Sequence, residues 1–122
     1  MFPCIKNLKL FSYSSCSTCR RAINWLKSND IAFELIDLLQ SPPSKEMLAS
    51  ASELYGDRKY LLNTSGKIYR SIGSDNVKKM TDNELFEKLC GEPRLIKRPF
   101  LYKSRKCFLV GFKEEEWAEK LL

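Results

Sequence analysis

Two cysteines separated by two residues, Cys16 and Cys19, are the residues of this chain best suited to chemistry. The apolar segment Leu8–Phe11 before them is typical of a short strand. The segment Thr18–Ser28 after them has apolar residues at helical spacing. The pair therefore falls where a strand leads into the first turn of a helix. The first backbone N–H groups of a helix have no internal partner and carry partial positive charge, so this position favours a thiolate.

These positions predict different roles for the two thiols. Cys16 lies where the strand turns into the helix, so we expect it to be the nucleophile, and Arg20 adds a full positive charge one turn further on. Cys19 falls on the apolar face of the helix, half turned towards the sheet. That placement suits a resolving thiol, which attacks only after Cys16 has reacted. The alternatives are two cysteines that merely pack, or two ligands of a zinc site.

The remaining cysteines do not complete a metal site, because Cys4, Cys90 and Cys107 are single and lack paired spacing. We expect Cys90 and Cys107 to be buried core thiols, since they fall on the apolar faces of a predicted helix and strand. Cys4 lies in the lead-in and is expected to be exposed. The chain has no histidine, which excludes Ser-His-Asp and Cys-His catalysis and any metal site that needs histidine.

Length and composition are those of one globular domain, which we expect to span residues 1–122. The chain has 122 residues, of which 43% are hydrophobic. It has no apolar run near the roughly 20 residues that cross a bilayer, and Met1–Lys6 does not resemble a signal peptide. These features predict a cytoplasmic protein without membrane contact. In that compartment a CxxC motif is more often catalytic, redox-sensing or metal-binding than structural.

The net charge of +6 is dispersed, with a local basic cluster in Arg94–Lys106. This cluster could meet an oxyanion, an acidic protein surface or nucleic acid, or it could simply be a solvated face. The sequence has no aromatic-interleaved RNA motif and no zinc-finger spacing. We therefore expect no sequence-specific binding of nucleic acid.

The order of the predicted elements indicates an α/β fold. Ile31–Ile36 is a second β-prone segment, so the first third of the chain reads as strand, helix, strand. The last third reads as strand, strand, helix. It comprises the hairpin strands Phe100–Tyr102 and Cys107–Val110 and the helix Glu114–Leu122. This order predicts a thioredoxin-like mixed four-stranded sheet.

A helical insertion from about Ser44 to Cys90 separates the two halves. Ser44 is suited to cap a helix that extends to about Tyr55. Thr81 and Glu84 have the spacing of a capping box for the last helix of the insertion. Short helical turns are predicted between these two helices, at Lys67–Ile72 and Asp75–Met80.

With these motifs in this order, the chain resembles the arsenate reductase (ArsC)/Spx-like family of thioredoxin-fold proteins. The resemblance covers nearly the whole chain from Leu8. It rests on four segments, which are Cys16–Arg20, Leu61–Gly66 with the following Tyr69-Arg70, Ile96–Pro99 and Leu109–Glu115.

The resemblance implies roles for several residues. Cys16 matches the redox cysteine of the family, Pro99 matches its cis-proline, and Arg98 matches the arginine before that proline. A cis bond at this point would direct Arg98 towards the end of the predicted first helix, where it could stabilise an oxyanion or a thiolate. Arg105 is a further candidate for the same task.

Two features bear on the branch of the family. An arginine expected near Asn63–Ser65 in arsenate-reducing members is replaced here by Asn, Thr and Ser. Single-thiol arsenate reductases also lack a CxxC and take their second thiol from glutathione. The Cys16–Cys19 pair instead resembles the Spx-like branch, in which a disulfide switches a regulator that binds RNA polymerase.

Three functions therefore remain open, and the sequence leaves undecided whether the chain is an enzyme. A thiol-disulfide redox protein is the first choice. The alternatives are an Spx-like regulator bound to RNA polymerase and a glutathione/glutaredoxin-dependent arsenate reductase. We expect no cofactor or metal, a monomer, and glutathione, glutaredoxin or thioredoxin as the reductant.

Overall fold

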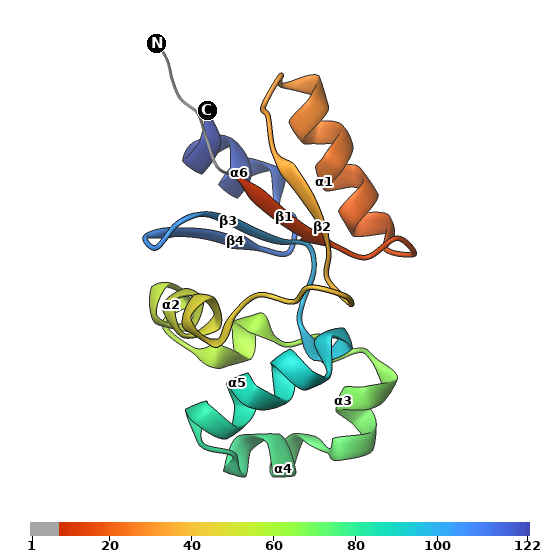
Figure 1. The fold of residues 1–122 in the computed structure, drawn as a ribbon, viewed down its shortest axis with the longest axis vertical. Helices are drawn as coiled ribbons and strands as arrows, with labels where there is room; N and C mark the ends of the chain where they lie inside the picture. Colours follow the sequence, from red (N-terminus) through yellow and green to blue (C-terminus); the bar gives the residue numbers. More distant parts are fainter. Residues whose placement is uncertain (1–7) are drawn as a thin grey trace.

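A mixed four-stranded sheet separates two groups of helices in the computed structural model, which describes residues 8–122 (Figure 1). The expectation for Cys4 lies outside the described residues. The strands are β1 (Lys9–Ser12), β2 (Glu34–Asp37), β3 (Phe100–Ser104) and β4 (Cys107–Val110), in the order β2-β1-β3-β4. β1 pairs in parallel with β2 and antiparallel with β3, and β3 pairs antiparallel with β4. The predicted mixed four-stranded sheet is confirmed.

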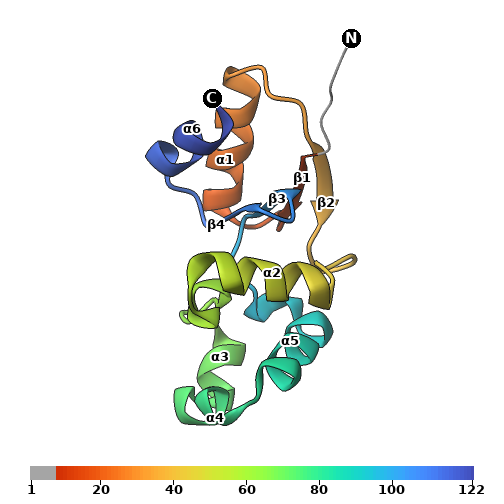
Figure 2. The same cartoon turned by 90° about the vertical axis from the view of Figure 1, so that its left-hand side faces the viewer.

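Each face of the sheet is covered by its own helices (Figure 2). Helices α1 (Ser17–Ser28) and α6 (Glu114–Leu121) cover one face, where Leu10 of β1 and Trp117 of α6 share a hydrophobic cluster. The helical insertion covers the other face, where Phe11 belongs to a second cluster. Neighbouring residues of one strand thus enter different clusters, because successive side chains of a strand point to opposite faces.

The insertion lies between β2 and β3, as predicted. Its first and last α-helices have the expected caps, since the Ser44 hydroxyl accepts a hydrogen bond from Met47 N–H at 3.1 Å and Thr81 and Glu84 form a capping box. Its elements are α2 (Lys45–Tyr55), the short 3-10 helix η1 (Arg58–Leu61), α3 (Lys67–Ile72), α4 (Ser74–Lys79), α5 (Asp82–Gly91) and the 3-10 helix η2 (Pro93–Leu95).

The predicted start of the second strand, Ile31, is wrong by three residues, because β2 begins at Glu34. Helix α1 ends in a turn in which Asp30 has a left-handed backbone, with φ 55°, and Ile31 N–H donates to Leu26 C=O at 3.0 Å. Ile31 therefore completes the end of α1 and packs on the cluster shared by α1 and α6. Among residues 8–122, no helix has both the length and the apolar character that crossing a membrane requires.

Candidate functional site

Cys16 caps the N-terminus of α1. Its backbone is extended, and its Sγ accepts a hydrogen bond from the Cys19 N–H at 3.2 Å. The Cys16 N–H in turn donates to the Tyr13 C=O at 3.0 Å, so the sulfur is held by a tight turn on one side and by the helix on the other. A sulfur in the place of an N-cap oxygen meets the positive end of the helix dipole.

Cys19 is buried beneath this turn, with an exposed fraction of 1%. Burial raises the pKa of Cys19 to about 11, and a hydrogen bond with the Cys16 side chain raises it further, whereas the Tyr13 backbone and the Ser12 side chain lower it. Both cysteines are free thiols, and Cys16 is partly exposed. At neutral pH Cys19 therefore keeps its proton while the Cys16 sulfur faces solvent and the helix N-terminus.

Arg20 and Arg98 both contact the loop between β1 and α1. The Arg20 Nη1 donates to the Ser14 C=O at 3.2 Å. The Arg98 guanidinium carbon lies 5.0 Å from the centroid of the Tyr13 ring, and Arg98 Nη1 donates to the Arg94 C=O at 3.1 Å. The structure thus brings both arginines to the loop that carries Cys16.

Two further features border this loop. The peptide bond between Arg98 and Pro99 is cis. A pocket of about 360 Å³ lies beside the loop and is lined by residues of the loop, α1 and β2, among them Arg20 and Leu35. Leu35 is 58% exposed on the edge strand of the sheet. The neighbourhood of Cys16 therefore offers both a positive charge and an apolar surface to a reaction partner.

Arg105 does not reach this site. It lies in the turn between β3 and β4, and the pairing of Phe11 with Phe100 and of Lys9 with Tyr102 places that turn at the other end of the sheet from Cys16. The two ends are visible in Figure 1, with the β3–β4 turn and the β1–α1 loop on opposite sides of the molecule. The reason is the antiparallel direction of β3, which carries the chain away from the site after Pro99.

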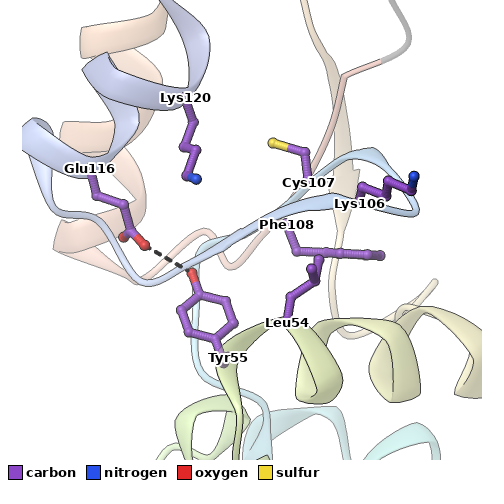
Figure 3. A pocket seen from close by; sticks show the side chains of 7 residues that line it. All are labelled: Leu54, Tyr55, Lys106, Cys107, Phe108, Glu116 and Lys120. Atoms are coloured by element: carbon purple, nitrogen blue, oxygen red, sulfur yellow. Dashed lines mark hydrogen bonds between the residues drawn. The ribbon is translucent and has the colours of Figure 1, made fainter.

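The prediction that Cys90 and Cys107 are buried core thiols is wrong, because both are partly exposed. The Cys90 Sγ donates to the Pro43 C=O at 3.5 Å, and burial raises the pKa of Cys90. Cys107 lines a pocket of about 270 Å³ between the β3–β4 hairpin and α6, together with Lys120 (Figure 3). Neither Cys90 nor Cys107 belongs to the site around Cys16. Within residues 8–122 there is no group of three or more His, Cys, Asp or Glu side chains that could hold a metal ion.

Sequence reasoning missed Tyr13. The signal was present, since Tyr13 is the one aromatic residue in the otherwise small, polar loop before Cys16. Its partner Arg98 is distant in sequence, and only the pairing of β1 with β3 brings the two together.

The ArsC family model matches residues 11–120 of the chain. This protein belongs to the ArsC family. It is 36% identical over 115 residues to the uncharacterised protein YusI of Bacillus subtilis strain 168, a match that covers 93% of this chain and 97% of YusI. It is 30% identical over 110 residues to the global transcriptional regulator Spx of Streptococcus agalactiae serotype V, covering 89% of this chain and 79% of Spx.

Among solved structures, the chain is similar to a possible arsenate reductase from Streptococcus mutans UA159. The TM-score is 0.83 at 32% sequence identity, covering 91% of this chain and 97% of the other. The thioredoxin-like fold predicted from the order of elements is thereby confirmed. The chain is a thiol redox protein of the ArsC/Spx-like family, whose relatives include a transcriptional regulator and a possible arsenate reductase.

Proposed function

We propose that this protein exchanges electrons between thiols and disulfides, with Cys16 as the nucleophile and Cys19 as the resolving thiol. The observation that carries the proposal is the contrast between the two sulfurs. The Cys16 Sγ accepts the Cys19 N–H at 3.2 Å and is partly exposed, whereas Cys19 is 1% exposed with a pKa raised to about 11. One thiol is thus accessible to a partner and the other is kept in reserve as a neutral thiol.

The reaction consists of two sulfur displacements. The Cys16 thiolate attacks one sulfur of a substrate disulfide, which forms a mixed disulfide and releases the first substrate thiol. Cys19 then loses its proton and attacks the Cys16 sulfur, which forms the Cys16–Cys19 disulfide and releases the second substrate thiol. The substrate gains two electrons and two protons, and the protein dithiol loses them.

We assign supporting roles to the residues around the pair. Arg20 and Arg98 would stabilise the Cys16 thiolate or an anionic partner, because both contact the loop that carries Cys16. Pro99 would act as the structural cis-proline that precedes β3. Glutathione, glutaredoxin or thioredoxin would return the disulfide to the dithiol.

The test is to trap the mixed disulfide. The reduced protein is mixed with glutathione disulfide, quenched with acid, alkylated and analysed by mass spectrometry. The native chain is expected to accumulate the Cys16–Cys19 disulfide, and Cys19→Ser is expected to stop at a mixed disulfide on Cys16. Cys16→Ser should do neither. If Cys16→Ser forms a mixed disulfide on Cys19 at the native rate, the assignment of the two roles is refuted.

An Spx-like regulator is the second candidate, favoured by the 30% identity to Spx over most of the chain. In this role the Cys16–Cys19 disulfide would change the affinity of the protein for RNA polymerase. Capture of purified RNA polymerase by the disulfide and dithiol forms tests this candidate, with Cys19→Ser as a form that cannot switch. Equal capture by all three forms would exclude a redox switch.

Arsenate reduction is the third candidate, favoured by the likeness to the Streptococcus mutans structure and by Arg98, which contacts Tyr13 in the loop that carries Cys16. It predicts arsenate turnover coupled to glutathione and glutaredoxin that is lost in Cys16→Ser. Absence of turnover, with the Cys16–Cys19 disulfide still forming, would leave the first two candidates.

A further inference from the structure

We propose that Tyr13 is a positioning residue, whose ring holds the Arg98 guanidinium beside Cys16 so that this thiol reacts preferentially with anionic partners. The inference rests on the proposed function, because it concerns the selectivity of the same nucleophile. It assigns the selectivity to a pair of side chains that meet only in the folded chain.

The sheet explains why the two side chains meet. β1 and β3 run antiparallel with Phe11 opposite Phe100. Continued by two residues beyond this pair, the same register brings Tyr13 opposite Arg98. The guanidinium carbon lies 5.0 Å from the centroid of the Tyr13 ring, which is the geometry of a cation–π contact.

The charge of Arg98 is held in place but is not neutralised. The Arg98 Nη1 donates to the Arg94 C=O at 3.1 Å, which uses one of the five N–H donors of a guanidinium. Both salt bridges found among residues 8–122 involve other side chains, Lys45 with Glu87 and Arg58 with Asp82. Arg98 thus retains a full positive charge and N–H donors for an anion.

Tyr13 links this charge to the reacting thiol. The Tyr13 C=O accepts the Cys16 N–H at 3.0 Å, so the backbone of Tyr13 belongs to the turn that presents the sulfur. The contact with Arg98 is made by the face of the ring. Phenylalanine should therefore replace Tyr13 without loss of the contact, whereas an aliphatic side chain should release Arg98.

The experiment compares an anionic and a neutral alkylating reagent of nearly equal size on the full-length protein. Rates of Cys16 modification by iodoacetate and iodoacetamide are measured by peptide mass spectrometry, and their ratio reports the local charge. A change in exposure or in nucleophilicity of the thiol acts on both rates alike and leaves the ratio unchanged. The variants are Arg98→Gln, Tyr13→Leu and Tyr13→Phe, with Lys103→Gln in β3 as a control that removes one positive charge at the far end of the sheet.

We expect the ratio to fall about two- to fourfold in Arg98→Gln, the effect of one unit charge acting over a short distance through water. Tyr13→Leu should show a similar fall, and Tyr13→Phe and Lys103→Gln should keep the native ratio. A native ratio in Tyr13→Leu or in Arg98→Gln overturns the proposal. A fall in Tyr13→Phe would do so too, and so would a fall in Lys103→Gln as large as that in Arg98→Gln.

Two measurements keep the test decisive. Nuclear Overhauser contacts between the Arg98 Cδ protons and the Tyr13 ring are expected in the native chain, and their absence overturns the proposal even if Tyr13→Leu fails to fold. Formation of the Cys16–Cys19 disulfide is followed in the same samples. If that disulfide does not form but the ratios behave as expected, the proposed function fails while the role of Tyr13 stands.

Discussion

The resolving step at Cys19 is expected to accelerate about tenfold for each pH unit between pH 7 and pH 10. Burial raises the pKa of Cys19 to about 11, and only a thiolate attacks a disulfide. At pH 7 only about one Cys19 in ten thousand is ionised, and each unit of pH below the pKa changes this fraction by a factor of about ten. The hydrogen bond that the Cys19 thiol makes to the Cys16 side chain is lost once Cys16 is in a mixed disulfide, but burial is the larger cause of the shift and persists.

The magnitude follows from comparison with an ordinary cysteine, whose pKa is about 8.5. At pH 7 the thiolate fraction of Cys19 is lower by a factor of roughly 300. A thiolate of higher pKa is intrinsically more nucleophilic, which recovers about tenfold of this loss. The resolving step at pH 7 should therefore be about thirtyfold slower than that of a cysteine with an unshifted pKa in the same geometry.

The assay isolates the pair by replacing Cys4, Cys90 and Cys107 with serine. This variant is mixed with the chromogenic disulfide of nitrothiobenzoate, which releases one coloured thiolate when Cys16 attacks and a second when Cys19 resolves. The rate of the second phase is recorded against pH, and Cys19→Ser, which should lack that phase, is the control. A second phase that reaches its plateau near pH 8.5 would refute the assigned protonation state of Cys19.

Three predictions concern stability. Tyr55→Phe should lower the free energy of unfolding in urea by about 1–3 kcal/mol, because the Val110 N–H loses an acceptor 2.9 Å away. The control Tyr60→Phe changes an exposed tyrosine and should have little effect, so equal losses in the two variants would refute this reasoning. Stability should also fall as pH rises from about 10 towards 12, because burial raises the folded-state pKa of Tyr55 to about 12 and the unfolded chain loses this proton first. In urea titrations at alkaline pH, the free energy of unfolding of Tyr55→Phe should fall less steeply with pH, and an unchanged slope would contradict the assignment of this effect to Tyr55. Trp117→Ala should lower the free energy of unfolding by about 3–5 kcal/mol in thermal or urea unfolding, because the side chain is fully buried and its Nε1 donates to the Gly111 C=O at 3.1 Å. A decrease below about 1 kcal/mol would contradict this prediction and mean that the core refills the cavity.

Elements whose signals lie within a few residues of one another were predictable from the sequence. Ser44, and Thr81 with Glu84, cap helices at the predicted positions, since a capping bond spans only three residues. The start of the second strand was not predictable. Ile31 is β-prone, but its N–H completes the end of α1, and that turn competes locally with pairing to β1.

Contacts between side chains that are distant in the sequence were not predictable from local patterns. Arg98 and Arg105 come from the same basic segment, and only the antiparallel direction of β3 decides that the first contacts the Cys16 loop and the second lies at the other end of the sheet. Cys107 belongs to a β-prone strand, yet it borders an open pocket because β4 is an edge strand next to α6.

The sequence by itself determined the order of the elements, the capped helix ends of the insertion and the placement of Cys16 at the start of a helix. These features depend on backbone hydrogen bonds and side-chain periodicity within one segment. The tertiary structure alone decided the burial that raises the pKa of Cys19, and it alone brought Arg98 onto Tyr13. Desolvation and the approach of a distant charge depend on segments brought together by strand pairing and helix packing, and no local pattern specifies those contacts.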